Sequence, residues 1–120
     1  MLRGKRPILA AAVVAVSLGA AGTADAATYH GFVGPGKTIK LLKASGTRVT
    51  RIPAGSHTFL IHDSSKTHNF VLARGSTTIR STGVSATGVF RWTGVRLRAG
   101  THTYYCATHK REMRGTFSVG

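Results

Sequence analysis

Residues 100–119 read GTHTYYCATHKREMRGTFSV and combine a strand-like pattern with a cluster of metal-binding side chains. Cys106 is the only cysteine of the chain, His109 follows three residues later, and Met113 is the only methionine besides the first residue. Further upstream, His68 begins the tripeptide His-Asn-Phe. A thiolate, two imidazoles and a thioether form the ligand set that favours copper in a trigonal site with a weak axial sulfur. This stretch therefore predicts a copper site at the end of a strand.

The strand before the cysteine carries its bulkier side chains on one face. Alternation along residues 101–106 places His102, Tyr104 and Cys106 on one side, and two threonines with Tyr105 on the other. We therefore expect Cys106 to point inward at the edge of the core. By the same parity His68 lies at the margin of the core.

The rest of the chain after residue 26 consists of short β-branched and aromatic runs separated by Gly, Pro and Ser. The expected strands are residues 37–43, 48–52, 57–62, 68–73, 77–81, 88–97, 101–106 and 116–119. Turn signals about every ten residues favour an all-β sandwich or barrel over alternating strands and helices. Residues 27–36 either form a loose lead or pair as a first strand.

The N-terminal segment has the three parts of a secretory signal peptide. Basic residues at positions 3, 5 and 6 precede an apolar stretch over 8–18, and Ala24-Asp25-Ala26 supplies a small-x-small cleavage pattern. The apolar stretch is short for a bilayer span and is followed by glycines. We expect residues 1–26 to be removed during export and 27–120 to form one domain without stable membrane insertion.

A single cysteine excludes an intramolecular disulfide, although small exported domains often depend on disulfides. A leftover thiol in a secreted chain indicates intermolecular pairing or a chemical use of the thiol. Metal binding would use the thiol and would also add free energy of folding.

The chain is strongly basic, with 17 Lys and Arg against 3 Asp and Glu and a net charge of +14. Such a charge attracts polyanions, acidic proteins or anionic surfaces; the alternative is a compositional bias with solvated side chains. The basic residues are spread over the expected strands, and few aromatic residues could stack on bases. We therefore expect no specific nucleic-acid partner.

Residues 100–119 resemble the C-terminal copper loop of the cupredoxins, the plastocyanin/azurin family, with its G-x-[aromatic]-x-[aromatic]-x-C-x-x-H…M-x-G pattern. His68-Asn69-Phe70 is similar to the upstream His-Asn-Phe of that family, and Pro53-Ala54-Gly55 to its Ala-Gly turn. The resemblance implies a Greek-key β-sandwich of about seven to eight strands with one type 1 copper ion.

By motif match, the resemblance implies His68, Cys106, His109 and Met113 as copper ligands. Asn69 is then expected to lie beside the ligands, where an amide or a backbone N–H near the sulfur locks the loop. Zinc would also accept the Cys and two His, but it prefers a carboxylate or water to a thioether. A Cys–His nucleophile is disfavoured because an enclosing loop leaves little room for a substrate.

The function implied is a monomeric, exported carrier of single electrons between redox proteins, not an enzyme. Lys110 and Arg111 follow His109 directly and would attract an acidic redox partner to that edge. Two alternatives remain open at this point: a copper-binding protein for copper delivery or tolerance, and a basic polyanion-binding extracellular module with a vestigial copper site.

Overall fold

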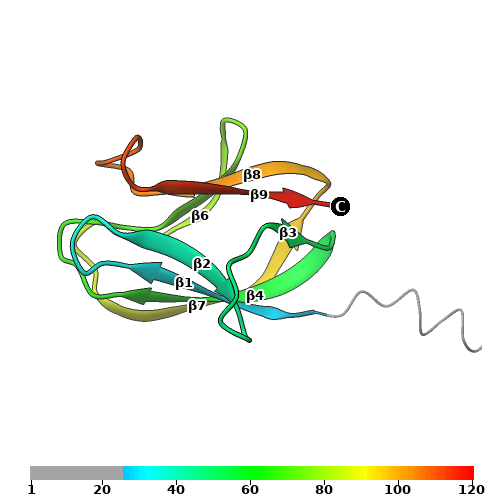
Figure 1. The fold of residues 1–120 in the computed structure, drawn as a ribbon, viewed down its shortest axis with the longest axis horizontal. Helices are drawn as coiled ribbons and strands as arrows, with labels where there is room; N and C mark the ends of the chain where they lie inside the picture. The colour runs from blue at the N-terminus through cyan, green and yellow to red at the C-terminus, as the bar shows by residue number, and fades with distance from the viewer. Residues whose placement is uncertain (1–25) are drawn as a thin grey trace, which may run out of the picture.

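The computed structural model describes residues 26–120, which form nine strands and no helix (Figure 1). The strands are β1 (Thr28–Val33), β2 (Ile39–Lys43), β3 (Arg51–Ile52), β4 (Gly55–Asp63), β5 (Val71–Arg74), β6 (Thr77–Ser81), β7 (Gly88–Leu97), β8 (Gly100–Tyr105) and β9 (Arg114–Val119). Within this part of the chain, no helical segment could cross a membrane. The expected signal peptide lies, apart from its last residue, outside the described residues.

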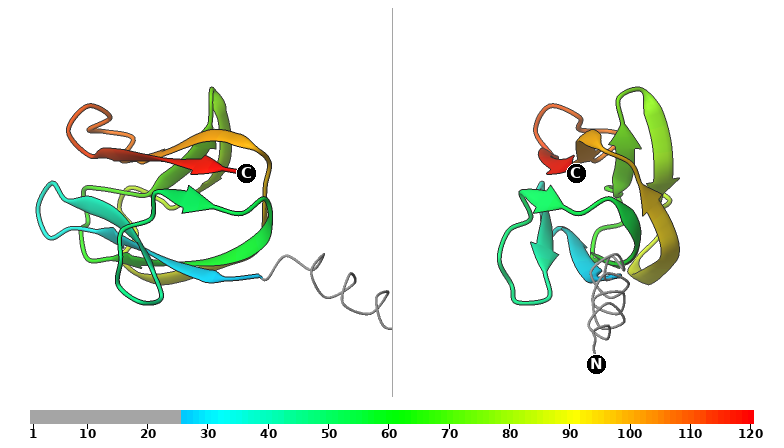
Figure 2. Two further views of the ribbon diagram at one scale, coloured as in Figure 1. Left: turned by 45° about the vertical axis from the view of Figure 1, so that its right-hand side comes forward. Right: turned by 90° about the vertical axis from the view of Figure 1, so that its right-hand side faces the viewer.

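The strands form two sheets that pack face to face (Figures 1 and 2). One sheet has the order β2-β1-β4-β7 and the other the order β3-β9-β8-β5-β6. Both sheets are mixed, because β1 pairs parallel with β4 and β3 pairs parallel with β9. Consecutive strands repeatedly change sheet, as in a Greek key, and the apolar faces meet between the layers. The predicted all-β sandwich is confirmed.

The structure has one strand more than the seven to eight expected. The additional strand is β1, which pairs with β2 on one side and with β4 on the other. Its inward residues are Tyr29, Gly31 and Val33, all buried. A Cβ on Gly31 would lie 2.7 Å from Ile61 Cδ1 and 2.9 Å from Phe70 Cε2. Glycine is therefore needed where Phe70 packs, and of the two alternatives for residues 27–36 the structure shows a paired first strand.

A column of aromatic rings runs through the core from one end of the sandwich to the other. Phe70 stacks on Tyr104 with ring centroids 5.5 Å apart and planes 4° from parallel. Tyr104 lies 6.3 Å from Phe117, which in turn stacks on His102 at 5.3 Å. Stacked aromatic pairs contribute about 0.5–1.5 kcal/mol each beyond their buried area.

The register between β5 and β8 defines two ends of the molecule. Val71 pairs with Tyr105 and Arg74 pairs with His102 in an antiparallel ladder. The residues just before β5 and just after β8 therefore lie at one end of the sandwich. Arg74 and His102 lie at the opposite end, about 13 Å along β8 from Cys106 at 3.3 Å per residue.

Candidate metal centre

Three side chains from separate positions in the sequence converge at the first of these ends. His68 precedes β5, Cys106 follows β8, and His109 lies in the loop between β8 and β9. Their ligand atoms all lie within 4.8 Å of one another. The antiparallel pairing of β5 with β8 causes this convergence, because it brings the start of one strand beside the end of the other.

The spacing of these atoms suits a single metal ion. Nδ1 of His68 lies 3.7 Å from Sγ of Cys106. Bonds of about 2.3 Å to sulfur and about 2.0–2.1 Å to nitrogen, as around zinc, give a separation of about 3.8 Å at a trigonal angle. The rings of His68 and His109 have centroids 4.7 Å apart and are inclined by 69°. The group fits one copper ion.

Hydrogen bonds around the sulfur favour its thiolate form. The Asn69 N–H donates to Sγ of Cys106 at 3.5 Å, and Oγ1 of Thr108 lies 3.2 Å from the sulfur. Burial would raise the pKa of the Cys106 thiol, but the hydrogen bonds from Thr108, Asn69 and His109 together bring that pKa below its ordinary value. The thiolate is the form that binds metals.

The loop that carries Cys106 and His109 is held in a compact turn by its own backbone. The Cys106 N–H donates to the Met113 carbonyl at 3.0 Å, and the Met113 N–H donates to the His109 carbonyl at 2.9 Å. A third bond runs from the His109 N–H to the Cys106 carbonyl at 3.1 Å. The two ends of the loop are thereby tied together before β9 begins.

Asn69 connects this loop to the body of the protein. Its Oδ1 accepts a hydrogen bond from the Ala107 N–H at 2.8 Å, and its Nδ2 donates to the Thr82 carbonyl at 2.8 Å. Asn69 is buried, and its bond to Thr82 is buried as well, whereas the bond from the exposed Ala107 is partly buried. The side chain thus fixes the position of Cys106 relative to His68.

Met113 is fully buried at the end of the same loop. The structure places it in the core cluster with Cys106 and Phe70. His109, in contrast, is partly exposed, and Lys110 and Arg111 beside it are exposed. The candidate centre therefore has a buried sulfur-containing side and a solvent-facing imidazole edge.

Two threonines at this site were not identified from the sequence. Thr108 contacts both the sulfur of Cys106 and Nδ1 of His109, the latter at 3.0 Å. Thr82 accepts a hydrogen bond from the Phe70 N–H at 2.9 Å through Oγ1. Thr108 could have been considered because it lies inside the C-x-x-H segment. Thr82 has no local signal, since only the return of the chain after β6 brings it here.

The chain has a cupredoxin-like sandwich, a fold that it shares with solved structures of copper proteins. The chain is similar to auracyanin A, a "blue" copper protein from the green thermophilic photosynthetic bacterium Chloroflexus aurantiacus. That match has a TM-score of 0.57 and 19% identity, and it covers 80% of this chain and 100% of the other.

The chain is also similar to rusticyanin from Thiobacillus ferrooxidans. This match has a TM-score of 0.58 and 18% identity, and it covers 80% of this chain and 79% of the other. A structure of reduced rusticyanin gives a TM-score of 0.58 at 19% identity, over 80% of this chain and 81% of that one. No protein-family model and no curated protein matches the sequence.

Proposed function

We propose that this protein is a one-electron carrier with a type 1 copper centre formed by His68, Cys106, His109 and Met113. The observation that carries the proposal is the convergence of one cysteine and two histidines beneath a closed loop, with the cysteine fully buried. The similarity of the fold to that of proteins named as blue copper proteins supports it. Bound copper would supply the change between Cu(I) and Cu(II).

The residues of the chain would hold the ligands nearly still during that change. Asn69 and the backbone bonds of the loop restrain Cys106 from two directions. A preorganised ligand set needs little reorganisation when the charge of the centre changes. Burial of Cys106 and Met113 excludes water and leaves no room for a substrate, so we propose a carrier and not an enzyme.

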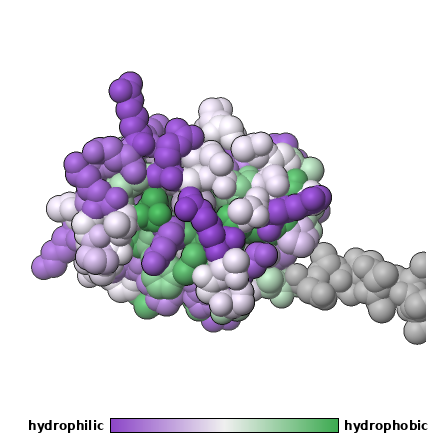
Figure 3. Space-filling model, in the orientation of Figure 1, coloured by the Kyte–Doolittle hydropathy of each residue, from purple (hydrophilic) through white to green (hydrophobic). Residues whose placement is uncertain are grey.

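Electrons would enter and leave at the partly exposed edge of His109. Lys110 and Arg111 lie next to it and are exposed. The nearby carboxylate, Glu112, forms an ion pair with Lys37 at 3.4 Å and is turned toward that lysine. Hydrophilic side chains gather over this end of the molecule (Figure 3). We propose that an acidic redox partner binds here, outside the cytoplasmic membrane, after export directed by residues 1–26.

Copper reconstitution tests the centre directly. The apo protein titrated with Cu(II) should develop an intense thiolate-to-copper absorption band at one equivalent, and the bound ion should show reversible one-electron voltammetry. Cys106→Ser should abolish the band, whereas Ser81→Ala, which removes an exposed hydroxyl from β6, should leave it unchanged. Absence of the band in the unmodified protein would sink the proposal. Ready release of copper to a chelator would instead favour copper delivery.

The rate of electron transfer to small reagents tests the docking edge. Oxidation of the reduced copper protein by ferricyanide, an anion, should slow in Lys110→Gln and Arg111→Gln, and the difference should shrink as salt rises. Arg48→Gln removes the same charge from an exposed position outside the loop that carries His109, and it should have less effect. Equal slowing in all three variants would contradict a localised docking edge.

A further inference from the structure

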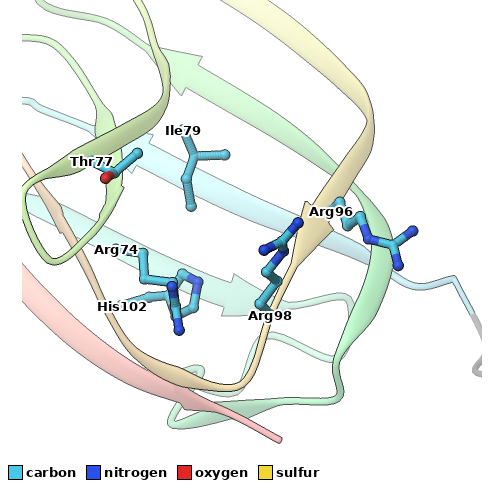
Figure 4. A pocket seen from close by; sticks show the side chains of 6 residues that line it. All are labelled: Arg74, Thr77, Ile79, Arg96, Arg98 and His102. Carbon is cyan, nitrogen blue, oxygen red and sulfur yellow. The ribbon is translucent and has the colours of Figure 1, made fainter.

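A second site is suggested by a cavity at the end of the sandwich opposite the candidate metal centre. The cavity has a volume of about 440 Å³ and is lined by Arg74, Thr77, Ile79, Arg96, Arg98 and His102 (Figure 4). It lies where β6, the last strand of one sheet, faces β7, the last strand of the other. Its volume is within the range of about 300–1,000 Å³ that is typical of small-molecule sites.

Three of the six lining residues are arginines, and they come from different sheets. Arg74 ends β5, whereas Arg96 and Arg98 lie in and just after β7. The lining residues include no carboxylate. Among residues 26–120 the only ion pair joins Lys37 to Glu112, so these arginines have no carboxylate partner in the described part of the chain. In Figure 4 the guanidinium of Arg96 points away from the other lining side chains, which leaves those of Arg74 and Arg98 beside the hollow. Two guanidinium groups without a carboxylate partner attract an anion there.

The arginine nearest the buried histidine is held in position. Nη2 of Arg74 donates to the Ala99 carbonyl at 3.0 Å. A Cβ on Gly100 would lie 3.2 Å from Nε of Arg74, so the absence of a side chain there lets the guanidinium lie over the turn between β7 and β8. A preorganised guanidinium loses less conformational entropy on binding a ligand than a free one.

His102 provides an independent observation at the same place. It is fully buried, and its Nδ1 lies 3.2 Å from the Gly100 carbonyl. Its Nε2 is buried without any hydrogen-bond partner among the described residues. Figure 4 shows His102 beside Arg74, its register partner on the neighbouring strand. Buried polar atoms without a partner are uncommon, and the described residues have three: this nitrogen, Oδ2 of Asp63 and the hydroxyl of Tyr104.

We propose that this cavity binds a multivalent oxyanion of the phosphate class, either free phosphate or a phosphate monoester. Guanidinium groups match the geometry of phosphate oxygens and bind them in pairs of charge-assisted hydrogen bonds. The site is independent of copper, because it lies at the other end of β8 from Cys106.

The proposal is tested by titrating the intact protein with sodium phosphate at constant ionic strength and following backbone amide shifts by NMR. We expect saturable shifts in β5, the β7–β8 turn and β8. Arg74→Gln and Arg98→Gln should each weaken binding about tenfold or more. Arg48→Gln removes the same charge from an exposed position that does not line the cavity, and it should change the affinity less than about twofold.

Further arms of the experiment separate the ligand sources and the two sites. Tighter binding of glycerol phosphate than of inorganic phosphate assigns an organic monoester, and the reverse assigns the free ion; either result supports the proposal. Cys106→Ser should bind phosphate normally, so loss of the copper band leaves this site untouched. Unsaturable shifts, equal weakening by Arg48→Gln, or binding of an acidic peptide but not of phosphate would each overturn the proposal.

Discussion

The two ends of β8 carry buried polar side chains that are treated in opposite ways. At one end, the sulfur of Cys106 has hydrogen bonds from Asn69 and Thr108 and lies among converging ligand atoms. At the other end, His102 keeps an unpartnered nitrogen beside Arg74. Thus β8 begins beside the positively charged hollow, and it is followed by the metal-binding group, whose side chains are held in place by hydrogen bonds. The hydrogen bonds of the sulfur are accounted for by neighbouring residues, whereas the unpartnered nitrogen of His102 still needs an explanation.

The largest loss of stability is expected from a substitution between the two ends, where Tyr104 packs against β9. Gly115 lies opposite Tyr104 in the ladder between β8 and β9, and a Cβ there would overlap the Tyr104 ring. Gly115→Ala should lower the free energy of unfolding by about 3 kcal/mol, because the ring cannot leave its stack on Phe70 without disturbing both ends. Chemical denaturation measures the loss.

Gly83→Ala is the matched control for this substitution. Its Cβ would meet only the Cβ of Ala86 at 3.6 Å, an ordinary contact. We expect no loss of stability there, and a gain of up to about 1 kcal/mol from the reduced entropy of the unfolded chain. If Gly115→Ala were as stable as Gly83→Ala, the close approach of Tyr104 to Gly115 would not require a glycine.

A smaller loss of stability should follow from removing the hydrogen bonds with which Asn69 holds the metal-binding loop. Asn69→Ala leaves the Ala107 N–H and the Thr82 carbonyl without their partner. The free energy of unfolding of the apo protein should fall by about 2 kcal/mol, since buried polar groups that lose their partners are costly. Ser81→Ala in exposed β6 should stay within about 0.5 kcal/mol of the unmodified protein. An unchanged Asn69→Ala variant would show that the loop holds itself.

A substitution at Met113 should change the reduction potential of the candidate metal centre without abolishing copper binding. We refer below to the end of the sandwich that holds this centre as the copper end. Met113→Leu keeps the fully buried position apolar but removes the thioether donor. We expect the absorption band to remain and the reduction potential to rise by about 60 mV, equivalent to a tenfold change in the relative affinity for Cu(I) and Cu(II). Voltammetry measures the shift. A potential identical to that of the unmodified protein would exclude Met113 as an axial ligand.

The smallest expected effect is a pH dependence of the stability that arises from His102. Burial lowers the pKa of His102, the Gly100 carbonyl partly opposes this, and the Arg74 cation lowers the pKa further. His102 of the unfolded chain therefore becomes protonated near pH 6.5, whereas His102 of the folded protein is still neutral at that pH. Stability linked to His102 should be full above that pH and should be lost as the pH falls toward the lowered folded pKa.

Comparison of the protein with His102→Phe isolates this contribution from the other histidines. Phenylalanine can keep the stack on Phe117 but does not titrate. The unfolding midpoint of the variant should fall less than that of the unmodified protein between pH 8 and pH 5. Parallel pH profiles would show that His102 is not the group responsible.

Much of the copper end was predictable because its information is local. Cys106, His109 and Met113 lie on one short loop, and strict alternation along β8 correctly predicted that Cys106 faces inward. The strand bounds of β6 and β7 were also predicted correctly, since Gly residues mark their ends. For residues 27–36 the sequence leaves a loose lead and a first strand as alternatives; the structure shows β1 there, with Gly31 allowing close packing of Phe70.

The amino-acid sequence by itself determined the all-β class, the identity of the candidate ligands and the strong positive charge. These follow from residue types and from periodicities within single segments. Only the tertiary structure decided that Thr82 and Thr108 support the copper end, and that Arg74, Arg98 and His102 surround one cavity. The physical reason is that such neighbours come from strands far apart in the chain. Pairing register and sheet order bring them together, and no local pattern encodes either.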